Sequence, residues 1–305
     1  MPRIAFVVPT ILVLILSTGK VALAGGTGAQ TGPAPSGILA KKWSTARSSP
    51  LDLELGGELN GLPVGATRYV TREQLLALPQ VAFTARNDEM FAGPTQVSGV
   101  PFEELARALG RQPGSDLVIA VASDGYRSTF PSSYVAAHHP VLVLQVNGKD
   151  PAEWPKDAEH GNDIGPYTVA YDNFLPSFQI FAHADEQQIP WGVIRLEFRD
   201  EKAVYGAIAP RGPHANDAAV QAGYRIAQQN CFRCHNAGPE GGQKSGRPWL
   251  VLSAWATASP EFFTAYVRDP KTKNPSSAMP GNPNYDDSTM RALIAYFRTF
   301  SAPAR

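Results

Sequence analysis

The stretch that decides this fold is Cys231-Phe232-Arg233-Cys234-His235, a C-x-x-C-H motif. The chain has 305 residues and two cysteines, and both cysteines lie in this motif. With two cysteines and six histidines in the whole sequence, chance would produce this arrangement on the order of once in several thousand such chains. Since the cysteines are three residues apart, a helical turn would point both sulfur atoms to one side. The motif therefore indicates chemistry that needs two thiols and an imidazole together.

Covalent attachment of haem needs that combination. Two thiols on one side of a turn can form thioethers with the two haem vinyl groups, while His235 offers a ring nitrogen to the iron. A thioredoxin-like redox pair would instead require a strand before the motif and a helix after it, and a zinc site would require a second pair of cysteines. The sequence has neither context. We therefore predict one haem c, held by Cys231 and Cys234, with His235 as an axial ligand.

Helical patterns surround the motif. Residues 217–230 have apolar side chains at helical spacing and lead directly into Cys231. Residues 288–300 predict a last helix with Asp287 as its N-cap, and we expect it to pack against the first. Residues 259–267 predict a third helix, because a Ser-Pro-Glu start is typical of an N-cap followed by proline and an acidic first turn.

Four stretches in this part of the chain together resemble the class I cytochrome c domain, from about residue 214 to the end. They are Ala222-Gly223-Tyr224, Tyr266-Val267-Arg268-Asp269-Pro270-Lys271, Ala278-Met279-Pro280-Gly281 and Tyr296-Phe297. The resemblance implies an all-α domain in which Met279 is the second axial ligand of the iron, on a loop before the last helix. Met279 follows His235 by 44 residues (279 − 235). A thioether ligand favours the reduced iron and raises its potential.

Other residues could take part in this site. Met290 and His214 are rival axial ligands, but Met290 lies in the predicted last helix, where core packing accounts for it, and His214 lies in a linker. Arg247 and the indole N–H of Trp249 are candidates for contact with a haem propionate. Trp249 also has the interpretation of an ordinary core residue.

The preceding region, residues 51–208, has a mixed pattern. Residues 117–122, 141–146 and 193–198 predict strands, and residues 71–78 and 102–109 predict short helices. The chain is therefore predicted to have two domains, an N-terminal α+β domain and a C-terminal all-α domain.

Parts of this region resemble the molybdopterin-binding domain of the sulfite oxidase family, over roughly residues 60–200. They are Ser98-Gly99-Val100-Pro101-Phe102, Ser123-Asp124-Gly125-Tyr126, Val146-Asn147-Gly148-Lys149 and His160-Gly161 followed by Gly165-Pro166. In that family a cysteine before the first of these stretches ligates molybdenum, and the corresponding segment here, near Thr84–Glu89, holds none. We therefore expect a docking module without bound molybdopterin.

If the N-terminal region has a pocket, Asp124, Arg127 and His160 are our candidates to line it, with no catalytic role assigned. His183 and the three histidines His138, His139 and His160 could in principle share a metal. The adjacent His138 and His139 would point in opposite directions on a strand, so we expect surface or packing roles instead.

The first residues are typical of a secretory signal. Arg3 precedes an apolar run from Ile4 to Leu16, and Ala22-Leu23-Ala24 forms a cleavage site before Gly25. An uncleaved membrane anchor is the other interpretation, but the run is shorter than the ~18 apolar residues that span a bilayer. We predict a signal peptide at residues 1–24, export to the periplasm, and no membrane span after cleavage.

The remaining organisation follows from composition. Residues 25–50 are rich in Gly, Pro and Ser and predict a flexible leader, and residues 209–213, with two prolines and a glycine, predict a linker before a domain at 214–305. Twenty-seven basic residues balance twenty-seven acidic ones, and no basic cluster indicates nucleic-acid binding.

These patterns favour an exported carrier of single electrons rather than a catalyst, since two axial ligands leave no open position on the iron. The expected partner is a redox protein that docks on the N-terminal domain. Two alternatives remain. One is a haem-coupled oxidoreductase with molybdopterin in the N-terminal domain, and the other is a gas sensor in which the ligand displaces Met279.

Overall fold

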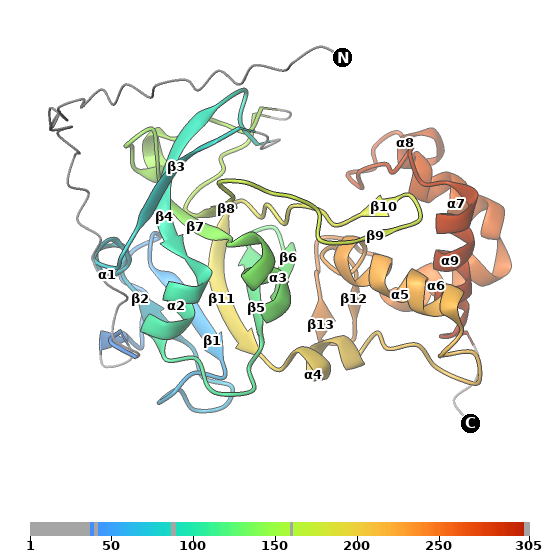
Figure 1. Ribbon diagram of the computed structural model, residues 1–305, viewed down its shortest axis with the longest axis horizontal. Helices are drawn as coiled ribbons and strands as arrows, with labels where there is room; N and C mark the ends of the chain where they lie inside the picture. The colour runs from blue at the N-terminus through green and yellow to red at the C-terminus, as the bar shows by residue number, and fades with distance from the viewer. Residues whose placement is uncertain (1–36, 40–41, 87–89, 159–160, 302–305) are drawn as a thin grey trace, which may run out of the picture. The chain divides into compact units, whose positions relative to one another are not determined.

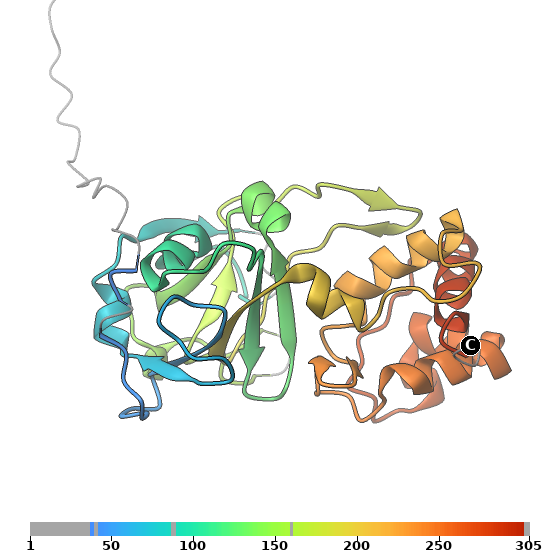
Figure 2. The ribbon, with the colours of Figure 1, turned by 90° about the horizontal axis from the view of Figure 1, so that it is seen from below.

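The computed structural model describes residues 37–39, 42–86, 90–158 and 161–301. The predicted signal peptide and most of the predicted leader lie outside these residues, as does His160. The two larger sheets belong to residues 53–199 and the long helices to residues 218–298 (Figures 1 and 2). This confirms a sheet-rich N-terminal region followed by a helical C-terminal region.

The first sheet of the N-terminal region has five strands in the order β2-β1-β11-β5-β6. These are β1 (Leu53–Gly57), β2 (Arg68–Val70), β5 (Leu117–Ala122), β6 (Arg127–Pro131) and β11 (Val193–Arg199). Only β1 and β11 pair in parallel, and the other neighbours are antiparallel. The strands predicted at 117–122 and 193–198 are thus neighbours in this sheet.

The second sheet has four strands in the order β3-β4-β7-β8, all antiparallel. These are β3 (Val81–Ala85), β4 (Thr95–Pro101), β7 (Val141–Val146) and β8 (Thr168–Ala170). The short helices of the region are α1 (Arg72–Leu76), α2 (Phe102–Leu109), α3 (Ser132–His138) and the 3-10 turn η2 (Pro151–Glu153). A two-stranded hairpin, β9 (Gln179–Ile180) and β10 (His183–Ala184), extends from this region (Figure 1).

The N-terminal region differs from the sequence prediction at two places. The helix expected at 71–78 is shorter, because Thr71 is the N-cap and forms a capping box with Gln74. His138 and His139 lie at the end of α3 and not on a strand, so the expected strand geometry was wrong. His139 has a positive φ and ends the helix.

The C-terminal region consists mainly of helices. These are α4 (Glu201–Gly206), α5 (Ala218–Asn230), α6 (Trp249–Ala258), α7 (Pro260–Arg268), α8 (Pro270–Lys273) and α9 (Asp287–Arg298), with the short strands β12 (Asn236–Ala237) and β13 (Glu240–Gly241) between α5 and α6. The three helices expected from the sequence correspond to α5, α7 and α9. The predicted linker at 209–213 falls between α4 and α5, and the domain boundary stays a prediction.

The start of α9 differs by one residue from the expectation. Asp286, and not Asp287, is the N-cap, since its carboxylate accepts hydrogen bonds from the Thr289 N–H at 2.8 Å and the Thr289 hydroxyl at 2.7 Å. These two hydrogen bonds lower the pKa of Asp286. Two aspartates in sequence satisfy the same capping pattern, and only the backbone direction decides between them.

Helices α5 and α9 pack together, as predicted, at a point of very close approach. A Cβ on Gly223 would lie 2.1 Å from the Ala292 carbonyl oxygen and 2.7 Å from Cβ of Tyr296. The ring of Tyr224 lies 5.6 Å from that of Tyr296. Residue 223 must therefore be glycine, because there is no room for a side chain between α5 and α9.

Strand β5 is buried on both faces. Val118 and Ala120 belong to the core of the N-terminal sheet, whereas Leu117 and Ile119 belong to the same cluster of buried side chains as α5, α6 and α9. The apolar run of β5 is thus explained by two cores, one on each side.

The close approach of α5 and α9 predicts that Gly223→Ala lowers the free energy of unfolding by about 1–3 kcal/mol, because the added methyl group forces the helices apart. Gly206→Ala is the matched control in α4, where a Cβ would meet nothing within 4 Å. It should leave stability unchanged or raise it by ~0.4–1 kcal/mol. Thermal unfolding followed by circular dichroism measures both, and equal effects would contradict the packing argument.

The cap of α9 predicts a pH-dependent contribution from Asp286. Because its pKa is lowered in the folded state, the charged carboxylate stabilises the fold above the unfolded value of about 3.9, and this contribution is lost as the pH falls through the folded pKa. Asp286→Asn keeps the capping oxygen but removes the charge. The variant should therefore melt below the wild type at pH 7, and the gap should close in acid; a constant gap would contradict the charge argument.

Candidate functional site

The C-x-x-C-H motif continues the last turn of α5. The Cys231 N–H donates to the Ala227 carbonyl at 3.0 Å, and the N–H groups of Cys234 and His235 both donate to the Cys231 carbonyl, at 3.2 and 3.0 Å. A helical turn of this kind places residues three apart on one side. Both thiols are free, and burial raises the pKa of Cys231 to about 12 and also raises the pKa of Cys234.

His235 is held in one tautomer by the backbone. Its side chain is buried, and Nδ1 lies 2.6 Å from the carbonyl oxygen of Arg247. A carbonyl can only accept, so Nδ1 must carry the proton and Nε2 keeps its lone pair. Burial lowers the pKa of His235, which favours the neutral imidazole. A histidine arranged in this way is prepared to bind a metal through Nε2.

A tight return of the chain brings residue 247 back to His235. The Gly242 N–H donates to the Phe232 carbonyl at 2.8 Å, and the Ser245 N–H donates to the Cys234 carbonyl at 3.0 Å. A Cβ on Gly242 would lie 1.8 Å from the Arg233 carbonyl oxygen. The segment can follow the motif this closely because glycine stands at that position.

Met279 lies half-buried in the loop between α8 and α9. Its N–H donates to the Ser277 hydroxyl at 3.3 Å, and that hydroxyl lies 3.2 Å from the hydroxyl of Tyr266. The loop is tied to the motif through Asn230, the residue before Cys231, which donates to the Asn282 side-chain oxygen at 2.8 Å. The structure thus joins the two segments that carry the predicted axial ligands.

The rival ligands have other surroundings. Met290 is 2% exposed and belongs to the cluster of buried side chains around α9. The side chain of His214 is 76% exposed and pairs with Asp217 at 2.9 Å. These are the packing and solvated positions expected for them.

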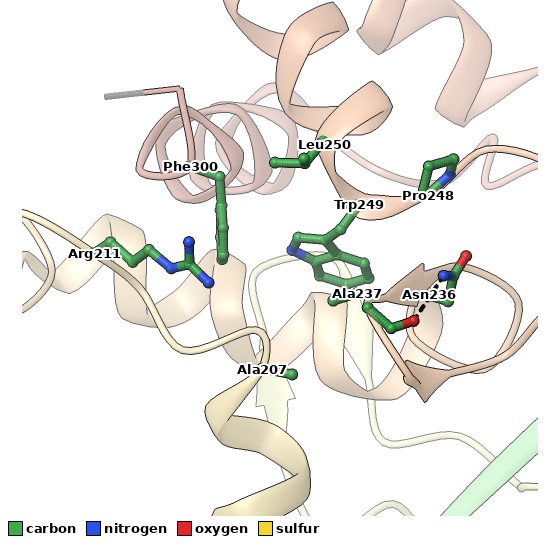
Figure 3. A pocket seen from close by; sticks show the side chains of 9 residues that line it. Ala207, Arg211, Asn236, Ala237, Pro248, Trp249, Leu250 and Phe300 are labelled. Carbon is green, nitrogen blue, oxygen red and sulfur yellow. Dashed lines mark hydrogen bonds between the residues drawn. The ribbon is translucent and has the colours of Figure 1, made fainter. Parts of the chain in front are cut away.

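Trp249 begins α6 and is a core residue. Its ring lies 5.0 Å from that of Phe297 and 5.7 Å from that of Phe232. It also forms one wall of a surface cavity of about 320 Å³, opposite Arg211 and Phe300 (Figure 3). The second interpretation of Trp249, as core, therefore has direct support. The guanidinium of Arg247 instead lies over the rings of Trp255 and Tyr266, at 5.5 and 5.6 Å.

Helix α6 was not predicted. Its ten residues, Trp249–Ala258, are almost uniformly apolar or small, so the segment lacks the separate polar and apolar faces of a surface helix. The contact of Arg247 with Trp255 was missed for the same reason. The run of apolar residues after Pro248 was the available signal.

The candidates for an N-terminal pocket lie against the C-terminal region. Asp124 pairs with Lys244 at 2.6 Å. Arg127 pairs with Glu197 at 2.8 Å, and its backbone N–H donates to the Arg233 carbonyl at 2.9 Å.

Of the histidines considered as possible metal ligands, His138 contacts the Asp185 carboxylate at 2.7 Å. In the described part of the chain, no group of three or more His, Cys, Asp or Glu side chains is arranged to hold a metal ion.

Comparison with known proteins agrees with the C-terminal assignment. Residues 218–297 match the family model of cytochrome c oxidase, cbb3-type, subunit III. No curated protein matches the chain. The solved structures that match include the sulfane dehydrogenase SoxCD from Paracoccus pantotrophus, at 16% identity over 56% of this chain and 45% of that chain, with a TM-score of 0.34. This chain thus spans less than half the length of that one. Residues 218–297 are a cytochrome c domain, which implies haem c.

The glycine beside the motif generates a prediction. Gly242→Ala should lower the free energy of unfolding by about 1–3 kcal/mol, because the new methyl group would overlap the Arg233 carbonyl. The displaced backbone should also lower the yield of covalently bound haem. Gly246→Ala is the control, since a Cβ there meets nothing within 4 Å. Haem staining of denatured protein on a gel measures attachment, and equal staining in both variants would contradict the prediction.

Proposed function

We propose that this protein is an exported c-type cytochrome that carries one covalent haem and transfers single electrons. Cys231 and Cys234 would form the thioethers, and His235 and Met279 would be the axial ligands of the iron. The observation that carries the proposal is the 2.6 Å hydrogen bond from His235 Nδ1 to the Arg247 carbonyl, because it leaves Nε2 unprotonated beside two free thiols on one turn.

The residues of the chain fit a haem by their chemistry. When bound, haem supplies an iron that alternates between the ferrous and ferric states. The His235 tautomer is fixed before any ligand binds, so the imidazole needs little reorganisation to bind the iron. The hydrogen bond from Nδ1 to the carbonyl also makes Nε2 more basic, and thus a stronger metal ligand. The thioether of Met279 is a soft ligand that favours the ferrous state. The Arg247 guanidinium is a candidate partner for a propionate.

We further propose that the sheet-rich N-terminal region docks the redox partner. Support comes from its contacts with the haem-attachment segment, where the Gln243 N–H donates to the Gly125 carbonyl at 2.8 Å and Arg199 pairs with Glu240 at 2.7 Å. A partner bound to this region would be close to the attached haem. Copurification or crosslinking that finds no partner depending on residues 51–208 would count against this part.

Export is part of the proposal because residues 1–24 have the pattern of a signal peptide. Within the described residues, no helix has both the length and the apolar character needed to cross a bilayer.

Metal analysis of the purified protein separates the carrier from the molybdopterin-dependent alternative. Iron without molybdenum supports the carrier, and molybdenum in stoichiometric amount supports an enzyme.

The axial assignment predicts the optical spectrum. Met279→Ala should retain covalent haem and a c-type reduced spectrum, but it should lose the weak far-red band of an iron–sulfur bond, and its reduction potential should fall. Met290→Leu, at a core position, is the control and should keep the band. The assignment is wrong if the far-red band survives in the Met279 variant, or if the wild-type ferrous haem is five-coordinate.

A further inference from the structure

A chain of hydrogen bonds runs from the β9–β10 hairpin of the N-terminal region to the loop that carries Met279. His183, in β10, is 1% exposed, and its Nδ1 lies 2.8 Å from the hydroxyl of Tyr285. Its Nε2 lies 2.9 Å from the side-chain oxygen of Gln229 in α5. Tyr285 is 5% exposed and follows Met279 by six residues (285 − 279). A buried histidine thus connects the hairpin, α5 and the loop.

The direction of each hydrogen bond in this chain is fixed at its far end by Asp185. The Gln229 amide nitrogen donates to the Asp185 carboxylate at 2.5 Å, so the Gln229 oxygen faces His183 and must accept from Nε2–H. The lone pair of His183 then lies on Nδ1, and Tyr285 donates to it. Burial alone would raise the pKa of Asp185, but hydrogen bonds, first from Ser177, outweigh burial and keep that pKa below its usual value.

Tyr285 in turn orders the loop next to the haem motif. The Asn230 amide nitrogen donates to the Tyr285 oxygen and to the Asn282 side-chain oxygen, both at 2.8 Å. Asn282 is three residues after Met279 (282 − 279), and its N–H donates to the Val267 carbonyl at 3.1 Å. Two anchors, Asn282 and Tyr285, therefore follow the methionine closely, and Asn230 donates a hydrogen bond to each.

Glu186, which follows the β9–β10 hairpin, also contacts the motif. Glu186 pairs with Arg233 at 3.0 Å, and Arg233 donates to the Asn230 side-chain oxygen at 2.5 Å. Asn230 is therefore held from both sides by groups that residues 183–186 position. Its amide is oriented so that the nitrogen faces the loop and the oxygen faces Arg233.

We propose that His183 is a positioning residue for the axial ligand Met279, acting through Tyr285 to keep the loop closed over the haem. This inference rests on the proposed function, because it assumes that Met279 binds the iron. It assigns to the N-terminal region a second role besides partner docking, namely control of the iron–sulfur bond. If the chain of hydrogen bonds is broken, the loop should open more often and Met279 should leave the iron more easily.

Imidazole is a suitable probe, since it binds ferric haem only when the methionine has left, and its apparent affinity therefore reports the open fraction. Tyr285→Phe removes one hydroxyl and keeps the ring, while His183→Ala removes the imidazole. Each change removes two hydrogen bonds, those of the Tyr285 hydroxyl with His183 and Asn230 or those of the His183 ring with Tyr285 and Gln229. Each should raise the affinity for imidazole about fivefold or more, since losing even one buried hydrogen bond has an effect of that size. The far-red band should weaken in parallel.

Arg199→Ala is the matched control. It breaks the ion pair with Glu240, which joins the same two regions but does not contact the Met279 loop, and the affinity for imidazole should stay unchanged. If Arg199→Ala raises the affinity as much as Tyr285→Phe, the effect is general loosening and the inference is overturned. Unchanged affinity in Tyr285→Phe overturns it as well, even if His183→Ala does not fold.

Met279→Ala measured in the same series separates the two proposals. If this variant loses the far-red band while Tyr285→Phe binds imidazole like the wild type, the axial assignment holds and the role of His183 is wrong. If Met279→Ala keeps the band, Met279 is not the ligand and both proposals fail.

Discussion

The hydrogen bond between His235 Nδ1 and the Arg247 carbonyl is the constraint on which the candidate site depends. It fixes the proton on Nδ1 and leaves on Nε2 a lone pair that can bind a metal. A backbone carbonyl serves this purpose well, because it cannot donate and cannot change its charge with pH. The bond exists only because the chain returns to the motif within twelve residues (247 − 235), and that return requires the glycine at 242.

The helices around the site form a frame for this arrangement. The motif follows the end of α5. Helix α9 packs against α5 at Gly223, where the absence of a side chain lets the two backbones come close together. The core they share includes side chains of α4 and continues into β5 of the N-terminal region. The N-terminal sheet is therefore part of the wall of the C-terminal core.

Local features of the sequence were predicted well. The motif, the helices α5, α7 and α9 and the strands β5, β7 and β11 all follow from patterns within a few residues, where spacing alone carries the information. The cap of α9 was misplaced by one residue because Asp286 and Asp287 offer the same side chain. Helix α6 was not predicted because apolar or small residues lie on nearly all sides of it, so its sequence has no helical periodicity of polar and apolar residues.

Long-range contacts were beyond the sequence. Asp124 and Arg127 were candidates to line a pocket, if the N-terminal region has one, and their contacts with Lys244 and Arg233, far along the chain, were not predicted. His183 was expected to have a surface or packing role, since nothing near it in sequence indicates its contact with Tyr285, which lies 102 residues later. A single sequence cannot reveal such pairs, because any polar residue has many possible partners and only the fold selects one.

The contacts between the two regions also bear on how an electron could reach the haem. The β5–β6 turn, with Asp124 and Tyr126, lies beside Lys244, whose ammonium is 5.8 Å from the Tyr126 ring, and Arg127 binds the backbone of the motif. The side of the attachment turn next to Cys234 is therefore covered by the chain's own N-terminal region. A partner that docks on that region would approach the haem across a contact that the chain already forms. Brief encounters between redox proteins bury small areas, so a partner need not displace the contacts between the two regions.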